Sequence, residues 1–264
     1  MTKENDLLTV EGIKNCLATR FIGTDIYIFD NIDSTNDYAM SLAKEGALDG
    51  TVVLADSQNK GKGRLGRSWF SPRGVNLYLS VVLRPKTALE HITLITFASA
   101  IALVRAINDI ANIEAHIKWP NDVLINNKKA AGILTEANTE ANKLNFCVIG
   151  MGINVNLNIN DLPLDLRDKA TSIMAETEKA IDRTALLCSL LKHIEDMYNI
   201  LAEGDFNRII EEWKSFAITL NRDVRIQSGN KVIEGIAVDI DNNGALLVTD
   251  RNGIIQRVLS GDVI

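Results

Sequence analysis

The chain has 264 residues, a formal net charge of −6 and a 46% share of hydrophobic residues. This composition is typical of a soluble globular protein, and it excludes a disordered chain, a collagen and a membrane-spanning protein. The length predicts one large domain with an appendage, or two domains. The acidic balance argues against a DNA or RNA partner, because binding to a phosphate backbone needs a clustered excess of cations.

Cysteine and histidine usage predicts neither disulfides nor a protein-bound metal. Cys16, Cys147 and Cys188 are odd in number and far apart, and no C-x-x-C pair occurs. Neither a disulfide framework nor a cysteine zinc site is therefore expected. The three histidines are too scattered for metal-ligand spacing. The N-terminus is acidic and lacks the apolar core of a secretory signal. A reducing cytoplasm is the compartment that fits these features.

Hydrophobic periodicity predicts a mixed or antiparallel sheet with helices in residues 1–218. Ser34, followed by Asp37, is expected to cap a helix that Gly46 ends. Residues 88–110 are apolar on most sides, which is typical of a central helix against a sheet, and they are too interrupted for a membrane span. Helices are expected at 8–20, 35–45, 88–110, 183–204 and 205–217, and strands at 25–30, 51–56, 76–83, 114–119, 122–126, 129–137 and 144–155.

The pattern changes in the last part of the chain. Residues 219–264 contain short apolar strands separated by turns at 228–230, 242–244 and 252–253, and the last strand is expected to run from 253 to 264. This pattern predicts a small all-β, barrel-like domain. The sequence therefore divides into domains at 1–218 and 219–264.

The loop QNKGKGRLGRSW (58–69), called the cationic loop below, holds the cations Lys60, Lys62, Arg64 and Arg67. Its glycines satisfy G-x-G-x-x-G, but no helix is expected to follow, so the dinucleotide fingerprint fails. A Walker loop fails as well, since Lys62 is followed by Gly63 instead of Ser or Thr. A glycine backbone with several cations can close on a phosphorylated ligand. A solvated hairpin tip is the simpler alternative.

Three more segments point to a ligand site. They are STN (34–36) at a helix start, KWPND (118–122) at a strand end and GMGIN (150–154) ending a buried strand. Each has a purely structural alternative: a helix cap, an edge lysine with a turn, and close backbone packing. Their joint occurrence with the cationic loop favours a site.

In this order, and with KxxGIL (129–134), the segments resemble the motifs of biotin protein ligases, and the resemblance spans essentially the whole chain. It implies an α+β fold of the class II aminoacyl-tRNA synthetase/biotin ligase type. This fold is a mixed β-sheet flanked by helices, with a small C-terminal SH3-like β-barrel domain. One departure is Lys62, which replaces the first loop arginine of the family and leaves its contact open, because lysine lacks the bidentate fork.

The resemblance also implies the activity. Such enzymes activate biotin with Mg-ATP to biotinyl-5'-AMP and transfer the biotinyl group to one lysine of a biotin carboxyl carrier protein or domain. The nucleophiles belong to the substrates, which explains the absence of a legible catalytic triad. The resemblance further suggests a homodimer formed through sheet edges. It implies ATP with Mg²⁺ as co-substrate, whose ligands in the protein the sequence does not identify, and no membrane partner.

Residue roles follow from the matched motifs. The catalytic residues implied are Lys118 and Arg64. The biotin-binding residues implied are Ser34, Thr35, Asn36, Gln58, Lys62, Gly63, Arg64, Lys118 and Gly132. The nucleotide-binding residues implied are Arg64, Arg67, Trp69, Lys118, Asn121 and Asn154, with a buried structural tryptophan as the alternative for Trp69.

Three other functions compete with this interpretation. A lipoate ligase shares the scaffold and the acyl-adenylate chemistry but lacks the loop quoted above. A DNA-binding repressor needs a helix-turn-helix module, for which the 33 residues before Ser34 are too few. A carrier-binding scaffold without catalysis is disfavoured because Gln58, Arg64 and Lys118 are present.

Overall fold

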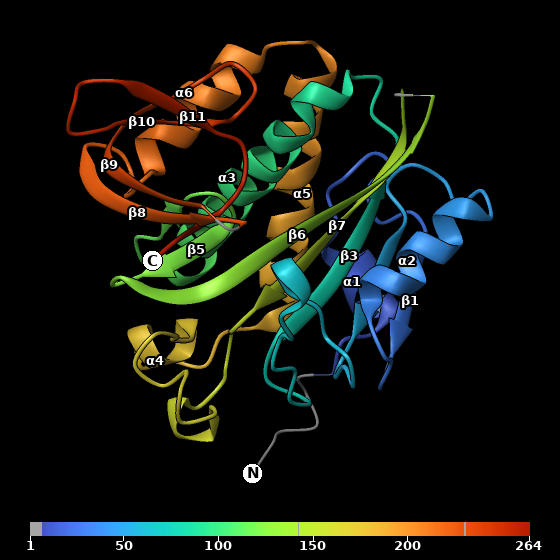
Figure 1. Ribbon diagram of the computed structural model, residues 1–264. Coiled ribbons are helices and arrows are strands. Elements are labelled where there is room, and N and C mark those ends of the chain that lie inside the picture. Colours follow the sequence, from blue (N-terminus) through green and yellow to red (C-terminus); the bar gives the residue numbers. More distant parts are fainter. Residues whose placement is uncertain (1–6, 142, 230) are drawn as a thin grey trace.

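A computed structural model describes residues 7–141, 143–229 and 231–264 (Figure 1). Residues 1–6, part of the N-terminus expected to lack a secretory signal, and Asn230, expected in a turn, lie outside the described residues. The helices are α1 (Val10–Cys16), α2 (Thr35–Lys44), α3 (Ile92–Ala111), α4 (Ile173–Thr177), α5 (Arg183–Ala202) and α6 (Phe206–Phe216). The strands are β1 (Ile26–Phe29), β2 (Val52–Ala55), β3 (Leu77–Leu83), β4 (His116–Lys118), β5 (Asp122–Ile125), β6 (Lys128–Glu140), β7 (Lys143–Ile153), β8 (Arg222–Ser228), β9 (Lys231–Ile240), β10 (Leu246–Thr249), β11 (Ile255–Val258) and β12 (Asp262–Val263).

Seven strands form the main sheet in the order β1-β2-β3-β7-β6-β5-β4. β1 and β2 are parallel, and all other neighbours in this sheet are antiparallel. The prediction of a mixed sheet is confirmed. Most expected helices and strands occur with shifted ends, whereas the short helix α4 was not predicted.

Helices cover both faces of the main sheet (Figure 1). On one face, Ala39 and Ala43 of α2 pack against side chains such as Val82 and Val148. The opposite face packs against α3 and α5 and forms the larger core. Successive residues of a strand point to opposite faces, so alternate residues of β7 serve the two layers. α2 begins as predicted, because the Ser34 side chain accepts a hydrogen bond from the Asp37 N–H.

The long apolar helix belongs to this core. The segment Leu89–Ala111 has the length and composition of a membrane span, but 67% of its apolar window is buried inside the protein. Its side chains pack between the main sheet and α5. This burial is typical of the core helix of a globular protein.

The C-terminal strands form a separate antiparallel sheet in the order β11-β10-β9-β8-β12. The prediction of one final strand over 253–264 was wrong, since residues 259–261 interrupt it and the two parts, β11 and β12, pair at opposite edges of the sheet. Within the described residues, β11 and β12 do not pair with each other, so the sheet is open.

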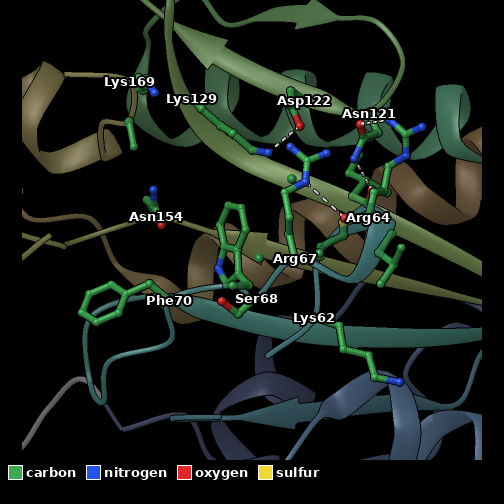
Figure 2. Close-up of a pocket in the computed structure, with 18 of the residues that line it drawn as sticks. Lys62, Arg64, Arg67, Ser68, Phe70, Asn121, Asp122, Lys129, Asn154 and Lys169 are labelled. Carbon is green, nitrogen blue, oxygen red and sulfur yellow. Dashed lines mark hydrogen bonds and ion pairs between the residues drawn. The ribbon is translucent and has the colours of Figure 1, made fainter. Parts of the chain in front are cut away.

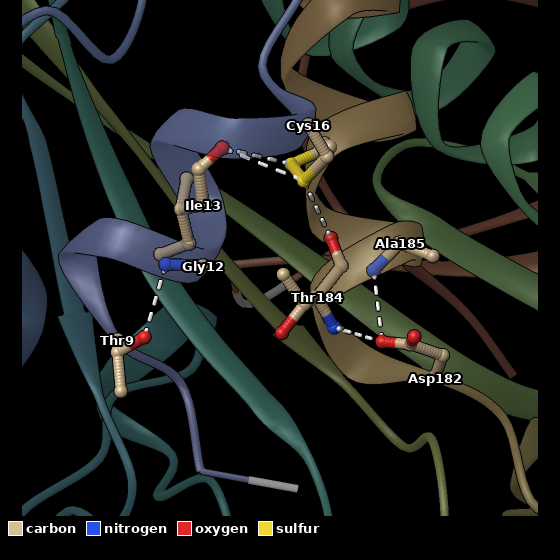
Figure 3. Close-up of a disulfide and its surroundings, with 8 residues drawn as sticks. Thr9, Gly12, Ile13, Cys16, Asp182, Thr184 and Ala185 are labelled. Atoms are coloured by element: carbon tan, nitrogen blue, oxygen red, sulfur yellow. Dashed lines mark hydrogen bonds between the residues drawn. A yellow bond between two sulfur atoms is a disulfide. The ribbon is translucent and has the colours of Figure 1, made fainter. Parts of the chain in front are cut away.

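A disulfide joins Cys16 to Cys188, and the prediction of no disulfide was wrong. α1 packs against α5 and brings the two Cα atoms to 6.0 Å, although 172 positions separate the residues (Figure 3). No spacing pattern reveals such a pair, because only tertiary packing creates it. Cys147 is free and buried. Cysteine usage therefore no longer supports a reducing compartment.

Candidate active site

A cavity of about 800 Å³ opens beside the N-terminus of α2 and extends over β6 and β7 toward the C-terminal sheet. It lies on the α2 face of the main sheet, because Gly150 and Gly152 point the same way as Val148. The structure brings every residue implied by the motifs to this one wall: Ser34, Thr35, Asn36, Gln58, Lys62, Gly63, Arg64, Arg67, Trp69, Lys118, Asn121, Gly132 and Asn154.

Glycines of β7 leave room for two side chains that cross the sheet. A Cβ atom on Gly150 would lie 2.0 Å from Asn36 Oδ1, and one on Gly152 would lie 2.4 Å from the Trp69 ring. Such distances exclude any other residue unless these side chains move. Close packing, the structural alternative for the two glycines, is thus real, and it is packing against residues that line the cavity.

One end of the cavity is formed by Ser34, Thr35, Asn36 and Gln58 and is called the polar end below. The first three side chains are at most 4% exposed. The Thr35 N–H donates to Gln58 Oε1 at 2.9 Å, and Gln58 Nε2 donates to Ser71 Oγ at 3.1 Å. Buried polar groups need partners, so this end is a preformed hydrogen-bonding surface.

The cationic loop folds back on itself over the cavity. The Gly63 N–H donates to the Arg67 carbonyl at 2.6 Å, and the Trp69 N–H donates to the Gly61 carbonyl at 2.8 Å. Between them lies a single 3-10 turn, Arg64–Gly66, in which Leu65 is 74% exposed. The predicted absence of a phosphate-binding helix after the glycines is consistent with this turn.

The two loop arginines meet the last strand of the chain. Arg64 Nη1 lies 3.1 Å from Asn121 Oδ1, 3.2 Å from the Gly261 carbonyl and 3.3 Å from Asp262 Oδ1. Arg67 pairs with the other oxygen of the same carboxylate. Burial lowers the pKa of Arg64, and attraction to Asp262 opposes that shift. The C-terminal sheet therefore closes one side of the cavity.

The other cations of the wall fall into two groups. Lys62 pairs with Asp37, and Figure 2 shows it directed away from Arg64 and Arg67. Lys129 Nζ lies 2.6 Å from Asp122 Oδ1. The side-chain ammonium groups of Lys118 and Lys169 have no hydrogen-bond or ion-pair partner in the part of the chain that the structure describes. These two ammonium groups are available to an anionic ligand.

Trp69 stands between the cationic loop and the glycines of the sheet. Its ring contacts Gly132 and Gly152, and Lys129 Nζ lies 5.3 Å from the ring centroid. Its Nε1 is buried without a hydrogen-bond partner among the described residues. The residue is partly buried and lines the cavity, so a packing role and a ligand contact occur together.

Comparisons with known proteins agree with this geometry. Residues 28–154 match the model of the "Biotin/lipoate A/B protein ligase family", and residues 219–264 match the "Biotin protein ligase C terminal domain". The "Bifunctional ligase/repressor BirA" of Bacillus subtilis is 36% identical, with all of this chain and 81% of that protein aligned. The chain belongs to the biotin protein ligase family.

Two further biotin protein ligases support this membership. The "Biotin--[acetyl-CoA-carboxylase] ligase" of Mycobacterium tuberculosis is 32% identical over 88% of this chain and 85% of that protein. The structure of the biotin protein ligase from Aquifex aeolicus, in complex with biotin and ATP, matches with a TM-score of 0.78 and 31% identity. The match covers 91% of this chain and 98% of that one.

Two parts of this biotin protein ligase cavity were not predicted from the sequence. One is the segment that contributes Leu162, Leu166 and Asp168, and the other is the strand end with Asp262. The leucines in an otherwise polar stretch are a signal that could have been used. Asn154 Nδ2 donates to the Thr171 carbonyl at 2.9 Å, which ties the first segment to the sheet.

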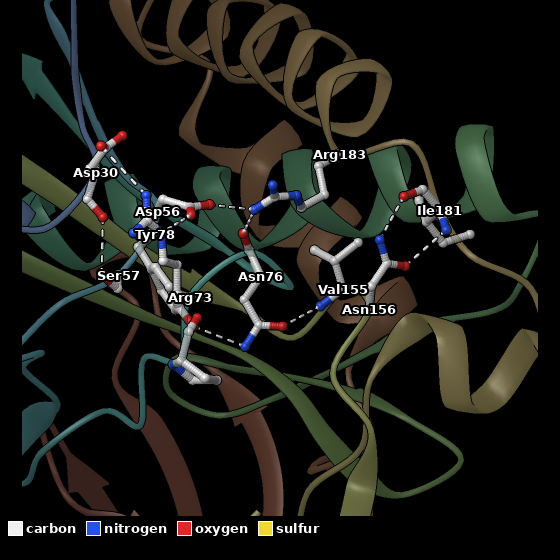
Figure 4. Close-up of polar contacts among 11 residues, drawn as sticks. Asp30, Asp56, Ser57, Arg73, Asn76, Tyr78, Val155, Asn156, Ile181 and Arg183 are labelled. Atoms are coloured by element: carbon white, nitrogen blue, oxygen red, sulfur yellow. Dashed lines mark hydrogen bonds and ion pairs between the residues drawn. The ribbon is translucent and has the colours of Figure 1, made fainter. Parts of the chain in front are cut away.

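A buried ion pair supports the start of the cationic loop (Figure 4). Arg183 is 1% exposed, and its Nη1 donates to Asp56 Oδ1 and to the Asn76 carbonyl, each at 3.0 Å. Asp56 Oδ2 also accepts from Arg73 Nε at 3.2 Å. Asp56 precedes Gln58 by two positions, so this pair anchors the backbone that carries a residue of the polar end.

Proposed function

We propose that this chain is an ATP-dependent biotin–[acetyl-CoA-carboxylase] ligase. The observation that carries the proposal is that a single cavity joins a buried polar end to the cationic loop. A neutral, hydrogen-bonding head group suits the first part, and a carboxylate beside a phosphate suits the second. Membership of the biotin protein ligase family supports the same activity.

Two displacement steps make up the reaction. A biotin carboxylate oxygen attacks the α-phosphorus of ATP, the bond to the β-phosphate breaks, and pyrophosphate leaves. The lysine amine of the carrier then attacks the acyl carbon, AMP leaves with the electron pair of the broken bond, and the amine loses a proton. The protein has to bring two anions together, and cations that offset their repulsion supply that stabilisation.

The proposed roles distribute along the cavity. The polar end and Gly132 contact the biotin head group, while Lys62 and Gly63 lie near its carboxylate. Lys118 and Arg64 face the reacting carboxylate and α-phosphate, and the unpaired state of Lys118 among the described residues supports this role. The nucleotide is bound by Arg64, Arg67, Trp69, Lys118, Asn121 and Asn154.

Lys62 needs a qualification of its role. Its pairing with Asp37 holds it at the α2 side of the cavity, away from the loop arginines. A contact between Lys62 and a phosphate therefore requires that this exposed pair opens, which costs little for a surface ion pair. Arg64 is partly buried in the wall, and a phosphate has to share it with Asp262 or displace that carboxylate.

Magnesium is proposed to arrive with the phosphates of ATP. The carboxylates of the wall are Asp122, Asp168 and Asp262, and two of them are paired with lysine or arginine. The described residues bring together no group of three or more side chains suited to hold a metal. The donors present fit a phosphate-bound ion that takes one or two protein oxygens.

The proposed partners are a biotin carboxyl carrier protein or domain, biotin and ATP, with neither DNA nor a membrane. We propose the division 1–218 and 219–264 into a catalytic and a C-terminal domain, which the C-terminal family match supports. The use of ATP supports a cytoplasmic location. A homodimer through a sheet edge is supported by β1, an edge strand with the exposed side chain of Tyr27.

The test separates the two steps. The protein is mixed with biotin and Mg-ATP and assayed for pyrophosphate release, and a carrier domain is then added and weighed by mass spectrometry. We expect the carrier to gain one biotinyl group. Lys118→Gln should abolish pyrophosphate release, whereas Lys128→Gln, at an exposed lysine on β6, should not. No mass gain in the presence of an active control enzyme would contradict the proposal.

Two further experiments test the alternative functions, a lipoate ligase and a DNA-binding repressor. Lipoate in place of biotin should give no acylated carrier; efficient lipoylation would favour the lipoate ligase. A gel-shift experiment with genomic DNA at physiological salt should show no specific complex. A carrier-binding scaffold predicts binding of the carrier without pyrophosphate release.

A further inference from the structure

Asn36, at the polar end, is held from behind by a residue outside the motifs. Its Nδ2 donates to Glu136 Oε2 at 2.8 Å, and its Oδ1 lies 2.6 Å from Ser80 Oγ. Glu136 is half-buried on β6 and is not among the described residues that line the cavity. Its hydrogen bond to Asn36 links it to the cavity.

The Glu136 carboxylate, together with the more distant Leu134 carbonyl at 3.4 Å, sets which way the Asn36 amide faces. An ionised carboxylate accepts hydrogen bonds and donates none, so it requires the amide nitrogen of Asn36 and rejects its oxygen. Asn36 Oδ1 is thereby turned to Ser80, which is fully buried and has one proton to give. Ser80 donates this proton to Asn36 Oδ1, because that contact, at 2.6 Å, is shorter than the contact with Thr35 Oγ1 at 2.9 Å.

The direction then passes along the wall. Ser80 Oγ lies 2.9 Å from Thr35 Oγ1, to which it is also able to donate, and the Thr35 hydroxyl donates to Gln58 Oε1 at 3.2 Å, so the Thr35 proton is held within the wall. Gln58 Oε1 accepts the Thr35 backbone N–H at 2.9 Å, so its Nε2 points the other way, to Ser71 Oγ. Ser71 in turn donates to the Trp69 carbonyl at 3.0 Å.

This arrangement determines what a ligand meets. Thr35 Oγ1 keeps a lone pair for an N–H donor, and Gln58 Nε2 keeps a second proton for a carbonyl acceptor. The cyclic urea of biotin presents two N–H donors and one carbonyl oxygen. A reversed Asn36 would set its Oδ1 against the Glu136 carboxylate and leave the Ser80 proton to Thr35 Oγ1, where it would occupy a lone pair that the urea N–H needs.

A positive charge, that of Lys62, attracts the Glu136 carboxylate. The hydrogen bond to Asp37 raises the pKa of Lys62, burial opposes the shift, and attraction to Glu136 adds to it. Lys62 is thus attracted by Glu136 as well as by Asp37, with which it is paired. Asn36 Oδ1 occupies the space above Gly150 that a Cβ atom would otherwise fill.

We propose that Glu136 is a positioning residue, which acts through Asn36 and sets the hydrogen-bond direction of the polar end for a cyclic urea. This inference rests on the proposed biotin ligase function and extends it to a residue that makes no contact with substrate. It assigns selectivity for N–H donors to a carboxylate one layer behind the wall.

The test compares Glu136→Leu with Glu136→Gln in the full chain, by pyrophosphate release. Glu136→Leu should raise the KM for biotin roughly 10- to 100-fold and leave the KM for ATP within about threefold, because only the polar end loses its direction. Glu136→Gln can still accept from Asn36 through its amide oxygen, so it should restore most of the affinity. Glu140→Gln, an exposed glutamate on the same strand, is the matched control and should leave all constants unchanged.

A second probe measures direction itself. A biotin analogue with one ring N–H replaced by oxygen lacks a donor, and the unaltered protein should discriminate against it about tenfold or more. In Glu136→Leu this discrimination should fall to about twofold. If Glu136→Leu does not fold, Glu136→Gln decides, since its discrimination should also fall, although less.

Unchanged discrimination in the folded variants would overturn the inference, as would equal increases in the KM for biotin and for ATP. Failure of the unaltered protein to release pyrophosphate contradicts the proposed function instead. The two outcomes are thus distinguishable in one assay.

Discussion

The guanidinium of Arg64 lies 3.3 Å from the carboxylate of Asp262, across 198 positions of sequence. Arg67 pairs with the same carboxylate. The C-terminal sheet therefore holds both loop arginines in the absence of substrate. A phosphate has to compete with Asp262 for these arginines or share them with it.

Asp262→Asn should free the cationic loop. The amide keeps the size of the carboxylate but removes the charge that both arginines share, so the loop should open more often before ligands bind. Trypsin cleavage after Arg64 and Arg67, followed by mass spectrometry, should become several-fold faster. Biotin with Mg-ATP should protect the unaltered loop. A cleavage rate equal to that of the unaltered protein would show that Asp262 does not hold the loop.

Arg64→Gly should loosen the retention of biotinyl-5'-AMP. A charge-assisted hydrogen bond contributes about 1.5–3 kcal/mol, which corresponds to a roughly 10- to 100-fold faster release of the adenylate. The rate is measured by trapping released adenylate, and stray biotinylation of bystander lysines should rise in parallel. Arg222→Gly, at an exposed residue that begins β8, is the control. An unchanged release rate would remove Arg64 from this role.

Alanine at each of the two glycines of β7 should affect the binding of one substrate and not of the other. Gly150→Ala forces Asn36 to move and should raise the KM for biotin, whereas Gly152→Ala displaces Trp69 and should raise the KM for ATP. Overpacking costs about 1–3 kcal/mol, so each increase should be roughly 5- to 100-fold. Steady-state kinetics of pyrophosphate release check the split. The same effect of both variants on both substrates would contradict it.

The disulfide should be detectable by thiol counting. Burial raises the pKa of the Cys147 thiol to about 12, so it stays protonated at pH 8 and unreactive in the folded protein. Only a pH near that folded value would ionise it. Ellman's reagent should therefore detect no thiol in the native protein, one after denaturation alone, and three after denaturation with reduction.

Loss of the disulfide should lower thermal stability. Cys16→Ser with Cys188→Ser opens a loop closed across 172 positions. Such cross-links typically contribute about 2–4 kcal/mol, which corresponds to a Tm lower by roughly 5–15 °C in a chain of this size. Dithiothreitol should lower the Tm of the unaltered protein similarly and leave the double variant unchanged. A Tm insensitive to both would mean that the bond does not form in solution.

Local patterns made most of the fold predictable. Helix starts such as Ser34 and alternating strands such as 25–30 depend on neighbours in sequence, and they were placed within a few residues. The thirteen residues assigned from the motifs all line one cavity, and their individual roles stay predictions. Their convergence on one cavity is visible only in the structure.

Features made by distant packing escaped prediction. The Cys16–Cys188 pair, the contact of Asp262 with Arg64, and Glu136 behind Asn36 each depend on segments that are far apart in sequence. No period or spacing encodes them. Lys62 keeps the positive charge of the arginine that it replaces, but this charge does not predict its contact. Its side chain pairs with Asp37 of α2.

The two glycines of β7 also set a distance within the site. They are two residues apart on one face of a strand, so the contacts above them are about 6.5–7 Å apart. Asn36 lies over Gly150, and Trp69 lies over Gly152. The pleat of a single strand thus sets the spacing between the Asn36 amide and the Trp69 indole. A shift of the β7 register by one residue would turn both glycine positions to the opposite face of the sheet, which α3 and α5 cover.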